Sequence, residues 1–235
     1  MTLLELDHVS KRYGRGLNEH LALRDVSLNV EAGEIVAVWG RRRSGRSTLL
    51  RIAAGVETPD AGAVRLEGTD LSGRGCELLG GGIGYCRKTF RPNEGRVVLD
   101  HLIVGQLARG VVPSAATDRA WEALERSDVG ASAKLKPGEL DANEAVRVAI
   151  ARALTLEPKL LLIDEPTIGV DLSDRDEILL LLHSLAGEGM AVVMSTGEAT
   201  ALAGGARALT LSEGELRGRP PRELAPVLPL RRRSA

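Results

Sequence analysis

A glycine-rich loop between an apolar run and a helix-like stretch constrains this chain more than any other feature. Residues 40–48 read GRRRSGRST, which follows the pattern G-x-x-x-x-G-K-[ST] except that Arg46 replaces the lysine. An apolar run at 35–38 precedes the loop, and a helix-like stretch at 47–54 follows it. In a strand, loop and helix of this kind, backbone N–H groups and the helix N-terminus surround phosphates. The pattern predicts a phosphate-binding loop whose principal cation has been changed.

Apolar runs alternate with helical patterns along the rest of the chain. Strand-like runs cover residues 3–9, 23–30, 35–38, 63–66, 83–85, 160–163 and 191–194, and helical patterns include 118–127 and 143–154. Continuous apolar strands that alternate with helices are typical of a mainly parallel sheet with helices on both faces. We therefore expect an α/β fold, followed by a loosely held tail at 219–235 that contains four prolines.

Composition excludes several classes of protein. The formal net charge is -1, whereas wholesale nucleic-acid binding favours a strongly basic face. Cys76 and Cys86 are too few for a disulfide framework or a metal site. No apolar stretch approaches the roughly 18 residues of a membrane span, and Met1 leads directly into a strand pattern rather than a signal peptide. We expect a cytoplasmic protein that acts at a membrane only through a partner.

A second motif ends the apolar run at 160–163 with two carboxylates, Asp164 and Glu165. A carboxylate at the end of a buried strand can hold a Mg²⁺-bound water, and the next carboxylate can polarise an attacking water. Alone, such a run is equally typical of a strand that ends in a solvated turn. Together with the loop at 40–48, it indicates nucleotide chemistry.

These two motifs, followed by Pro-Thr-Ile-Gly-Val-Asp at 166–171, resemble the ATP-binding subunit of an ABC transporter. The resemblance extends from residues 9–14 to 212–216 and is strongest to the branch that serves lipoprotein release, macrolide export and cell division. It implies a RecA-like P-loop nucleotide-binding domain over 1–218, with an N-terminal antiparallel β subdomain. A helical subdomain at about 87–154 is expected to interrupt the core, which covers about 1–86 and 155–218.

The resemblance also implies the ligands, ATP and Mg²⁺, and the residues that hold them. The nucleotide-binding positions are Tyr13, Gly40, Arg43, Ser44, Gly45, Arg46, Ser47, Thr48 and Lys88. Ser47 and Asp164 are the implied metal ligands, and Glu165 is the implied catalytic residue. Tyr13 is expected to stack on adenine, although a half-buried aromatic at the end of a strand fits its sequence equally well.

Partners follow from the same resemblance. It implies a membrane permease and a second nucleotide-binding subunit, identical or different, on the cytoplasmic face of the membrane, where this chain is peripheral. Asp171 is expected in the loop that contacts the second subunit. The run Arg41-Arg42-Arg43 is more typical of a solvated basic patch than of a binding element.

Four positions depart from the family pattern. Besides Arg46, residues 140–144 read LDANE in place of LSGGQ, Lys88 replaces a glutamine, and Gly197 replaces a histidine. An ammonium cannot coordinate Mg²⁺, and glycine has no side chain to reach a γ-phosphate. Asp141 would bring negative charge toward a phosphate held by the opposite subunit, which is unfavourable in a dry interface.

Three hypotheses follow from these departures. The first is a degenerate ATP-binding subunit that transmits conformational change with little or no hydrolysis. The second is a working ABC ATPase in which Arg46 and Glu165 suffice. The third is a regulatory or scaffold subunit that docks on a membrane protein, with nucleotide optional.

Overall fold

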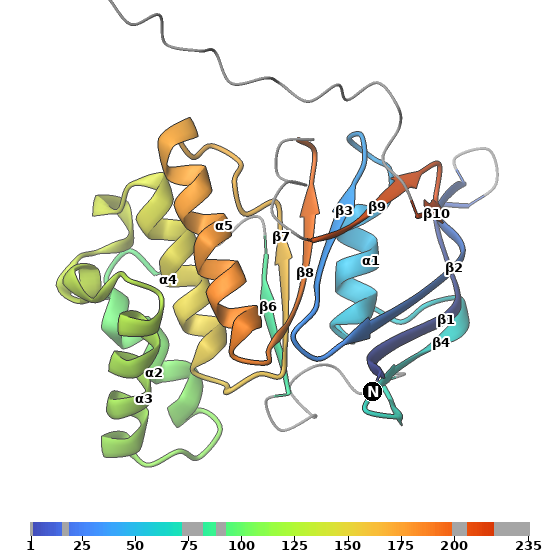
Figure 1. The fold of residues 1–235 in the computed structure, drawn as a ribbon. Helices are drawn as coiled ribbons and strands as arrows, with labels where there is room; N and C mark the ends of the chain where they lie inside the picture. The colour runs from blue at the N-terminus through green and yellow to red at the C-terminus, as the bar shows by residue number, and fades with distance from the viewer. Residues whose placement is uncertain (1, 16–18, 72–81, 88–92, 199–205, 219–235) are drawn as a thin grey trace, which may run out of the picture.

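The computed structural model describes residues 2–15, 19–71, 82–87, 93–198 and 206–218 (Figure 1). Lys88, Cys76 and the expected tail at 219–235 lie outside the described residues.

The larger sheet of the described chain has six strands in the order β10-β9-β3-β8-β7-β6. Its strands are β3 (Ile35–Trp39), β6 (Ile83–Cys86), β7 (Leu160–Asp164), β8 (Ala191–Thr196), β9 (Arg207–Ser212) and β10 (Glu215–Arg217). All pairs are parallel except the hairpin between β9 and β10. Every residue of β7 and β8 is buried, as continuous apolar strands covered on both faces require. The expected mainly parallel sheet is confirmed.

A second, antiparallel sheet contains the N-terminal strand and lies on the right in Figure 1. Its strands are β1 (Thr2–Tyr13), β2 (His20–Glu31), β4 (Ala61–Leu66) and β5 (Thr69–Asp70), in the order β2-β1-β4-β5. Helix α1 (Arg46–Ala53) packs between the two sheets, and its buried leucines join one core cluster with residues of both. This cluster fixes the helix that follows the glycine-rich loop.

Helices α4 (Ala142–Leu154) and α5 (Leu172–Gly187) cover the other face of the larger sheet (Figure 1). Helices α2 (Val98–Leu107) and α3 (Pro113–Arg126) pack against α4 and against each other, and short 3₁₀ turns lie at Gly130–Lys134 and Pro137–Glu139. The helix expected at 118–127 begins five residues earlier, because Pro113 occupies its first turn, where a missing N–H costs nothing. No helix among the described residues combines the length and apolar character that a bilayer crossing requires.

A buried arginine joins three of these helices. Arg147 lies on α4 with a side chain only 8% exposed. Its Nη1 donates to the Ser127 carbonyl at the end of α3 (3.1 Å), and its Nη2 donates to Glu177 on α5 (3.0 Å). Its Nε also donates to Asn143 in the first turn of α4 (2.9 Å). Arg147 therefore holds the N-terminal part of α4 against its neighbours.

Replacing Arg147 with alanine should lower the free energy of unfolding by about 2 kcal/mol, because the buried Ser127 carbonyl loses its partner. Urea denaturation of the variant measures the change. Arg119→Ala is the matched control, since Arg119 pairs with Glu157 at the surface and its loss should cost less than about 1 kcal/mol. Equal losses from the two variants would contradict the role given to Arg147.

Candidate functional site

The order of the strands brings three loops to one edge of the larger sheet. The glycine-rich loop follows β3, Gly197 follows β8, and Glu165 follows β7, and these strands are neighbours in the order β3-β8-β7. Ser195 on β8 lies opposite both Val38 and Asp164 in the register. The carboxyl ends of neighbouring parallel strands are where open α/β sheets bind ligands. The position after β8 therefore lies between the loop and the two carboxylates.

The glycine-rich loop has the backbone of a phosphate cradle. Gly45 has a φ of 104° and precedes the first residue of α1, and no side chain caps that helix. A Cβ at Gly45 would lie 2.1 Å from the Ala22 carbonyl oxygen, so only glycine fits there. Arg43 also has a positive φ, of 66°, and its side chain is exposed. Among the described residues, the buried Ser44 hydroxyl has no hydrogen-bond partner. An uncapped helix N-terminus beside an unsatisfied hydroxyl fits an anionic group.

Arg46 spans the site to the end of β7. Its Nη2 donates to Oε1 of Glu165 at 2.6 Å, and the two side chains are only 7% and 11% exposed. The Nη1 atom is buried and has no partner within the described residues. Arg46, the expected phosphate-binding cation, is therefore paired with Glu165, the expected catalytic carboxylate.

Gly197 provides the space for this pair. A Cβ built at Gly197 would lie 3.4 Å from Nη1 and 3.6 Å from Nη2 of Arg46, so a methyl group would fit in ordinary contact. A longer side chain that continued in the same direction would meet the guanidinium. The departures at positions 46 and 197 are thus neighbours in space.

Asp164 and Glu165 have different environments although they are adjacent in sequence. Asp164 is buried and accepts a hydrogen bond from the Ser195 hydroxyl at 2.5 Å. Glu165 has a φ of 53°, and its N–H donates to the same hydroxyl at 3.1 Å. This left-handed backbone turns the Glu165 side chain away from the strand direction and toward Arg46. Ser47, the other implied metal ligand, is half-buried in the first turn of α1.

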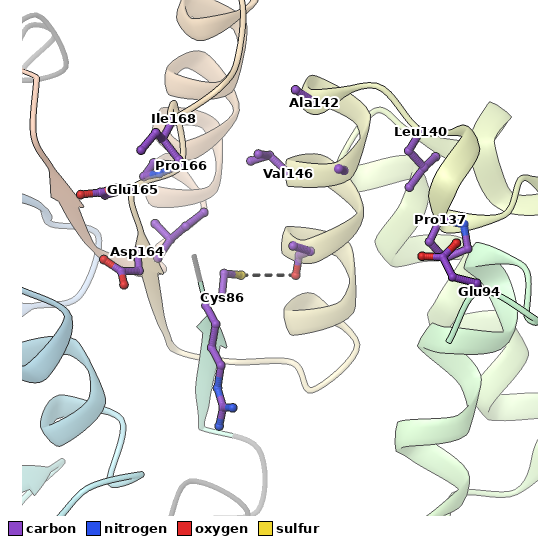
Figure 2. Close-up of a pocket in the computed structure, with 14 residues that line it drawn as sticks. Cys86, Glu94, Pro137, Leu140, Ala142, Val146, Asp164, Glu165, Pro166 and Ile168 are labelled. Carbon is purple, nitrogen blue, oxygen red and sulfur yellow. Dashed lines mark hydrogen bonds between the residues drawn. The ribbon is translucent and has the colours of Figure 1, made fainter. Parts of the chain in front are cut away.

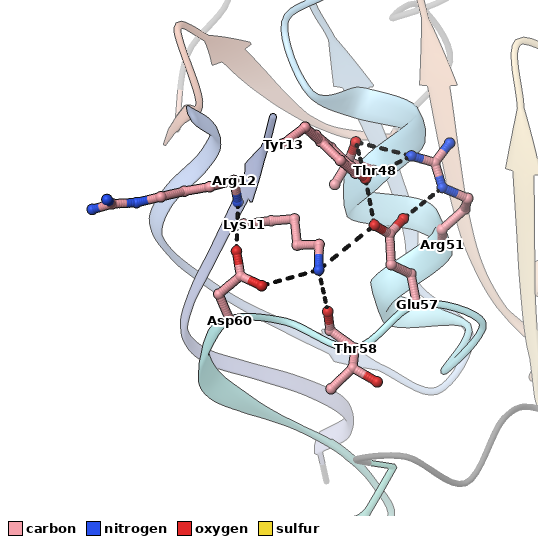
Figure 3. Close-up of polar contacts among 8 residues, drawn as sticks. All are labelled: Lys11, Arg12, Tyr13, Thr48, Arg51, Glu57, Thr58 and Asp60. Atoms are coloured by element: carbon pink, nitrogen blue, oxygen red, sulfur yellow. Dashed lines mark hydrogen bonds and ion pairs between the residues drawn. The ribbon is translucent and has the colours of Figure 1, made fainter. Parts of the chain in front are cut away.

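Tyr13 is the last residue of β1 and is half-buried, and its hydroxyl is anchored to α1 and the turn after it (Figure 3). The hydroxyl donates to Glu57 at 2.6 Å and accepts from Arg51 at 2.9 Å. Burial acts to raise the pKa of Glu57, but hydrogen bonds from Tyr13 and Arg51 and the nearby Lys11 charge outweigh it and lower that pKa. Lys11 also lies over the Tyr13 ring, 5.8 Å from its centroid. The network fixes the orientation of the ring.

Two cavities meet at the ion pair between Arg46 and Glu165. The first, of about 580 Å³, is lined by Tyr13, His20, Ala22 and the loop from Arg42 to Thr48, which includes Arg43, Ser44, Gly45, Arg46 and Ser47. The second, of about 450 Å³, is lined by Gly40, Thr167, Thr196, Gly197 and Glu198, among others. Arg42, Arg46 and Glu165 line both. The implied nucleotide positions that the structure describes are therefore gathered around one site. Lys88 lies outside the described residues.

The altered signature at 140–144 forms the start of α4. Asp141 is the N-cap, and its carboxylate accepts from the Glu144 N–H at 2.8 Å, while the Glu144 carboxylate accepts from the Asp141 N–H at 3.0 Å. Ser132 adds a hydrogen bond to Glu144 at 2.7 Å. The Asp141 carboxylate thus caps its own helix, a role that the spacing D-x-x-E could have predicted and that the sequence analysis missed.

Figure 2 shows a third cavity, of about 370 Å³, between α4 and the end of β7. Asp164 and Glu165 lie on one side of it, and Leu140 and Val146 lie on the other. Burial raises the pKa of the Cys86 thiol to about 12, and this thiol donates to the Ala149 carbonyl at 3.3 Å. Cys86 is therefore held as an unreactive thiol in the wall of this cavity.

Comparisons with known proteins agree with this geometry. Residues 23–168 match the family model described as ABC transporter. The chain is 36% identical over 200 residues to the lipoprotein-releasing system ATP-binding protein LolD of Cereibacter sphaeroides, covering 83% of this chain and 89% of LolD. It is 31% identical over 218 residues to the macrolide export ATP-binding/permease protein MacB of Paracoccus denitrificans, covering 91% of this chain and 33% of MacB.

Solved structures give the same result. The dimeric structure of MJ0796, a bacterial ABC transporter cassette, superposes with a TM-score of 0.82 at 28% identity, covering 93% of this chain and all of that one. A post-hydrolysis dimer of the same cassette, bound to ADP and Pi, superposes with a TM-score of 0.81. The cassette fold, the site at the strand ends and the sequence matches all agree: this chain belongs to the ABC transporter family, as one of its nucleotide-binding subunits.

Proposed function

We propose that this chain is a degenerate nucleotide-binding subunit, which couples ATP binding to a membrane permease and hydrolyses little or no ATP itself. The observation that carries the proposal is the 2.6 Å ion pair between Arg46 and Glu165. A carboxylate that accepts a charge-assisted hydrogen bond from a buried guanidinium is poorly available to orient and polarise a water molecule.

Two further features support weak hydrolysis. Gly197 leaves the position after β8 without a side chain, and the Arg46 guanidinium lies beside it. Asp141 presents a carboxylate at the helix N-terminus that would face a nucleotide held by the opposite subunit. Each feature removes a group that the transition state of phosphoryl transfer would need, while the loop backbone that holds phosphates is retained.

The partners we propose are a membrane permease and a second nucleotide-binding subunit, identical or different. The chain would then be a peripheral protein on the cytoplasmic face of the membrane. Exposed apolar side chains support a subunit contact beside the site: Ile168 is 50% exposed and Leu172 is 78% exposed, on either side of Asp171. Mg²⁺, when bound, would be held by Ser47 and Asp164, although one oxygen of Asp164 already accepts from Ser195.

The purified chain should turn over ATP at less than about 0.01 s⁻¹, two orders of magnitude below the slow end of typical enzymes. Arg46→Lys alone should restore little, because Gly197 and Asp141 remain as they are. A phosphate-release assay measures both rates. Turnover of roughly 1 s⁻¹ that disappears in Glu165→Gln would instead identify a working ABC ATPase.

Asp141→Ser should strengthen ATP-driven closure of the two nucleotide-binding subunits. Serine keeps the N-cap of α4 but removes the charge that faces the opposite nucleotide. We expect about a tenfold rise in the subunit association constant at saturating ATP, measured by crosslinking across the interface in the transporter complex.

The triple variant Asp141→Ser, Ala142→Gly, Asn143→Gly restores the family sequence at these positions, but it weakens α4 by up to about 2 kcal/mol in helix propensity and removes the Asn143 acceptor from Arg147. The single variant is therefore the cleaner comparison, with Asp141→Asn as a neutral cap of similar size. If neither variant closes more readily than the native chain, Asp141 does not oppose closure.

The chain should co-purify with a membrane permease from the cells that produce it, because its cores and helices are complete despite the altered site. Affinity purification in mild detergent, followed by mass spectrometry, identifies the partner. A folded chain that retains no integral membrane protein would contradict the proposed transporter complex.

A further inference from the structure

The guanidinium of Arg46 occupies the part of the site that lies between the ends of β7 and β8. It is 2.6 Å from the Glu165 carboxylate after β7 and lies against Gly197 after β8. The family resemblance implies that the group after β7 polarises the attacking water and that the group after β8 reaches the γ-phosphate. A third phosphate would therefore have to enter the volume that this guanidinium fills.

The rest of the phosphate cradle is open. The cavity beside Tyr13 runs along the loop to Thr48 and ends at Arg46 and Glu165. The N-terminus of α1 has no side-chain cap, and both the Ser44 hydroxyl and Arg46 Nη1 are buried without a partner among the described residues. The uncapped helix N-terminus and the Ser44 hydroxyl suit phosphates held along the loop, on the near side of the ion pair.

We infer that this site holds a nucleoside diphosphate in preference to a triphosphate, because the Arg46–Glu165 pair fills the position of the third phosphate. The inference rests on the proposed function in that it assumes the loop binds nucleotide. It adds the class of nucleotide and the residues that select it.

Charge and burial set the direction of the preference. A diphosphate leaves the ion pair intact and can bind the uncapped N-terminus of α1 and the Ser44 hydroxyl. A triphosphate must displace the guanidinium from Glu165 and then lie beside that carboxylate in a site where both side chains are about nine-tenths buried. Separating a buried ion pair is costly, and like charges repel strongly when water is excluded.

Isothermal titration of the full chain in Mg²⁺ tests the inference with ADP, ATP and a non-hydrolysable ATP analogue. We expect ADP to bind at least about tenfold more tightly than the analogue, a difference of about 1.4 kcal/mol. Arg46→Lys should reduce the ratio of the two dissociation constants to about one, because the shorter side chain withdraws from Gly197. Glu165→Gln should also reduce this ratio to about one, because it removes the charge that repels the third phosphate. This second variant tests the inference even if Arg46→Lys does not fold.

Arg126→Lys is the matched control. Arg126 also forms an Arg–Glu pair, at 2.5 Å from Glu188, but Glu188 precedes β8 and so lies at the opposite edge of the sheet. Its substitution should leave the ratio unchanged.

Each outcome separates the inference from the function on which it rests. If the analogue binds as tightly as ADP, the preference for a diphosphate is wrong and nucleotide binding stands. If both Arg46→Lys and Glu165→Gln still prefer ADP, these two residues do not cause the preference. If neither nucleotide binds, the proposed nucleotide-binding role fails together with the inference.

Discussion

The parallel pairing of β3, β8 and β7 determines where every polar group of the site lies. These strands are almost entirely buried, so polar side chains can reach a common space only where the strands end. Their register places Ser195 opposite both Val38 and Asp164, which sets the three following loops side by side. Residues as distant in sequence as Arg46 and Glu165 then come within hydrogen-bond distance. A shift of one residue in this register would turn each side chain to the opposite face of the sheet. The apolar pattern that sets the register therefore also determines which polar residues meet at the strand ends.

The ion pair between Arg46 and Glu165 is a stabilising contact at these strand ends, and it also occupies space in the site. Without Glu165, the buried Arg46 guanidinium would lose its carboxylate partner, which is costly in a buried position. Lysine concentrates its charge on one ammonium group, whereas the planar guanidinium can donate to Glu165 while lying flat against Gly197. The pair therefore balances two buried charges at the centre of the site.

Much of the fold could be predicted from the sequence, because it depends on local patterns. The strand–loop–helix at 35–54 and the apolar strands that end at Asp164 and Thr196 identify a mainly parallel α/β domain directly. The ends of helices were less certain: α3 begins at Pro113 rather than near 118, since its first turn carries little apolar signal. The antiparallel sheet followed from the family resemblance rather than from periodicity.

The site was only partly predictable. Arg46 and Gly197 stand out in the sequence as departures from the family pattern, but the sequence could not reveal that the two lie close together, because that depends on the order of β3, β8 and β7. Nor could it give the partner of Arg46, which lies far along the chain. Asp141 is different, since the capping box with Glu144 is a local pattern, and it was interpreted only as a charge facing another subunit.

The contact between Arg46 and Gly197 also restricts the mutational paths open to this protein. A histidine at 197 would extend from a Cβ 3.4 Å from Nη1, so it would need a rotamer that avoids the guanidinium or a shift of Arg46. A lysine at 46 beside Gly197 would leave the space after β8 without any side chain. The two positions are therefore coupled, because a change at either one alters the space available at the other. The side chain that position 197 can accept thus depends on the residue at position 46, although the two positions are far apart in the sequence.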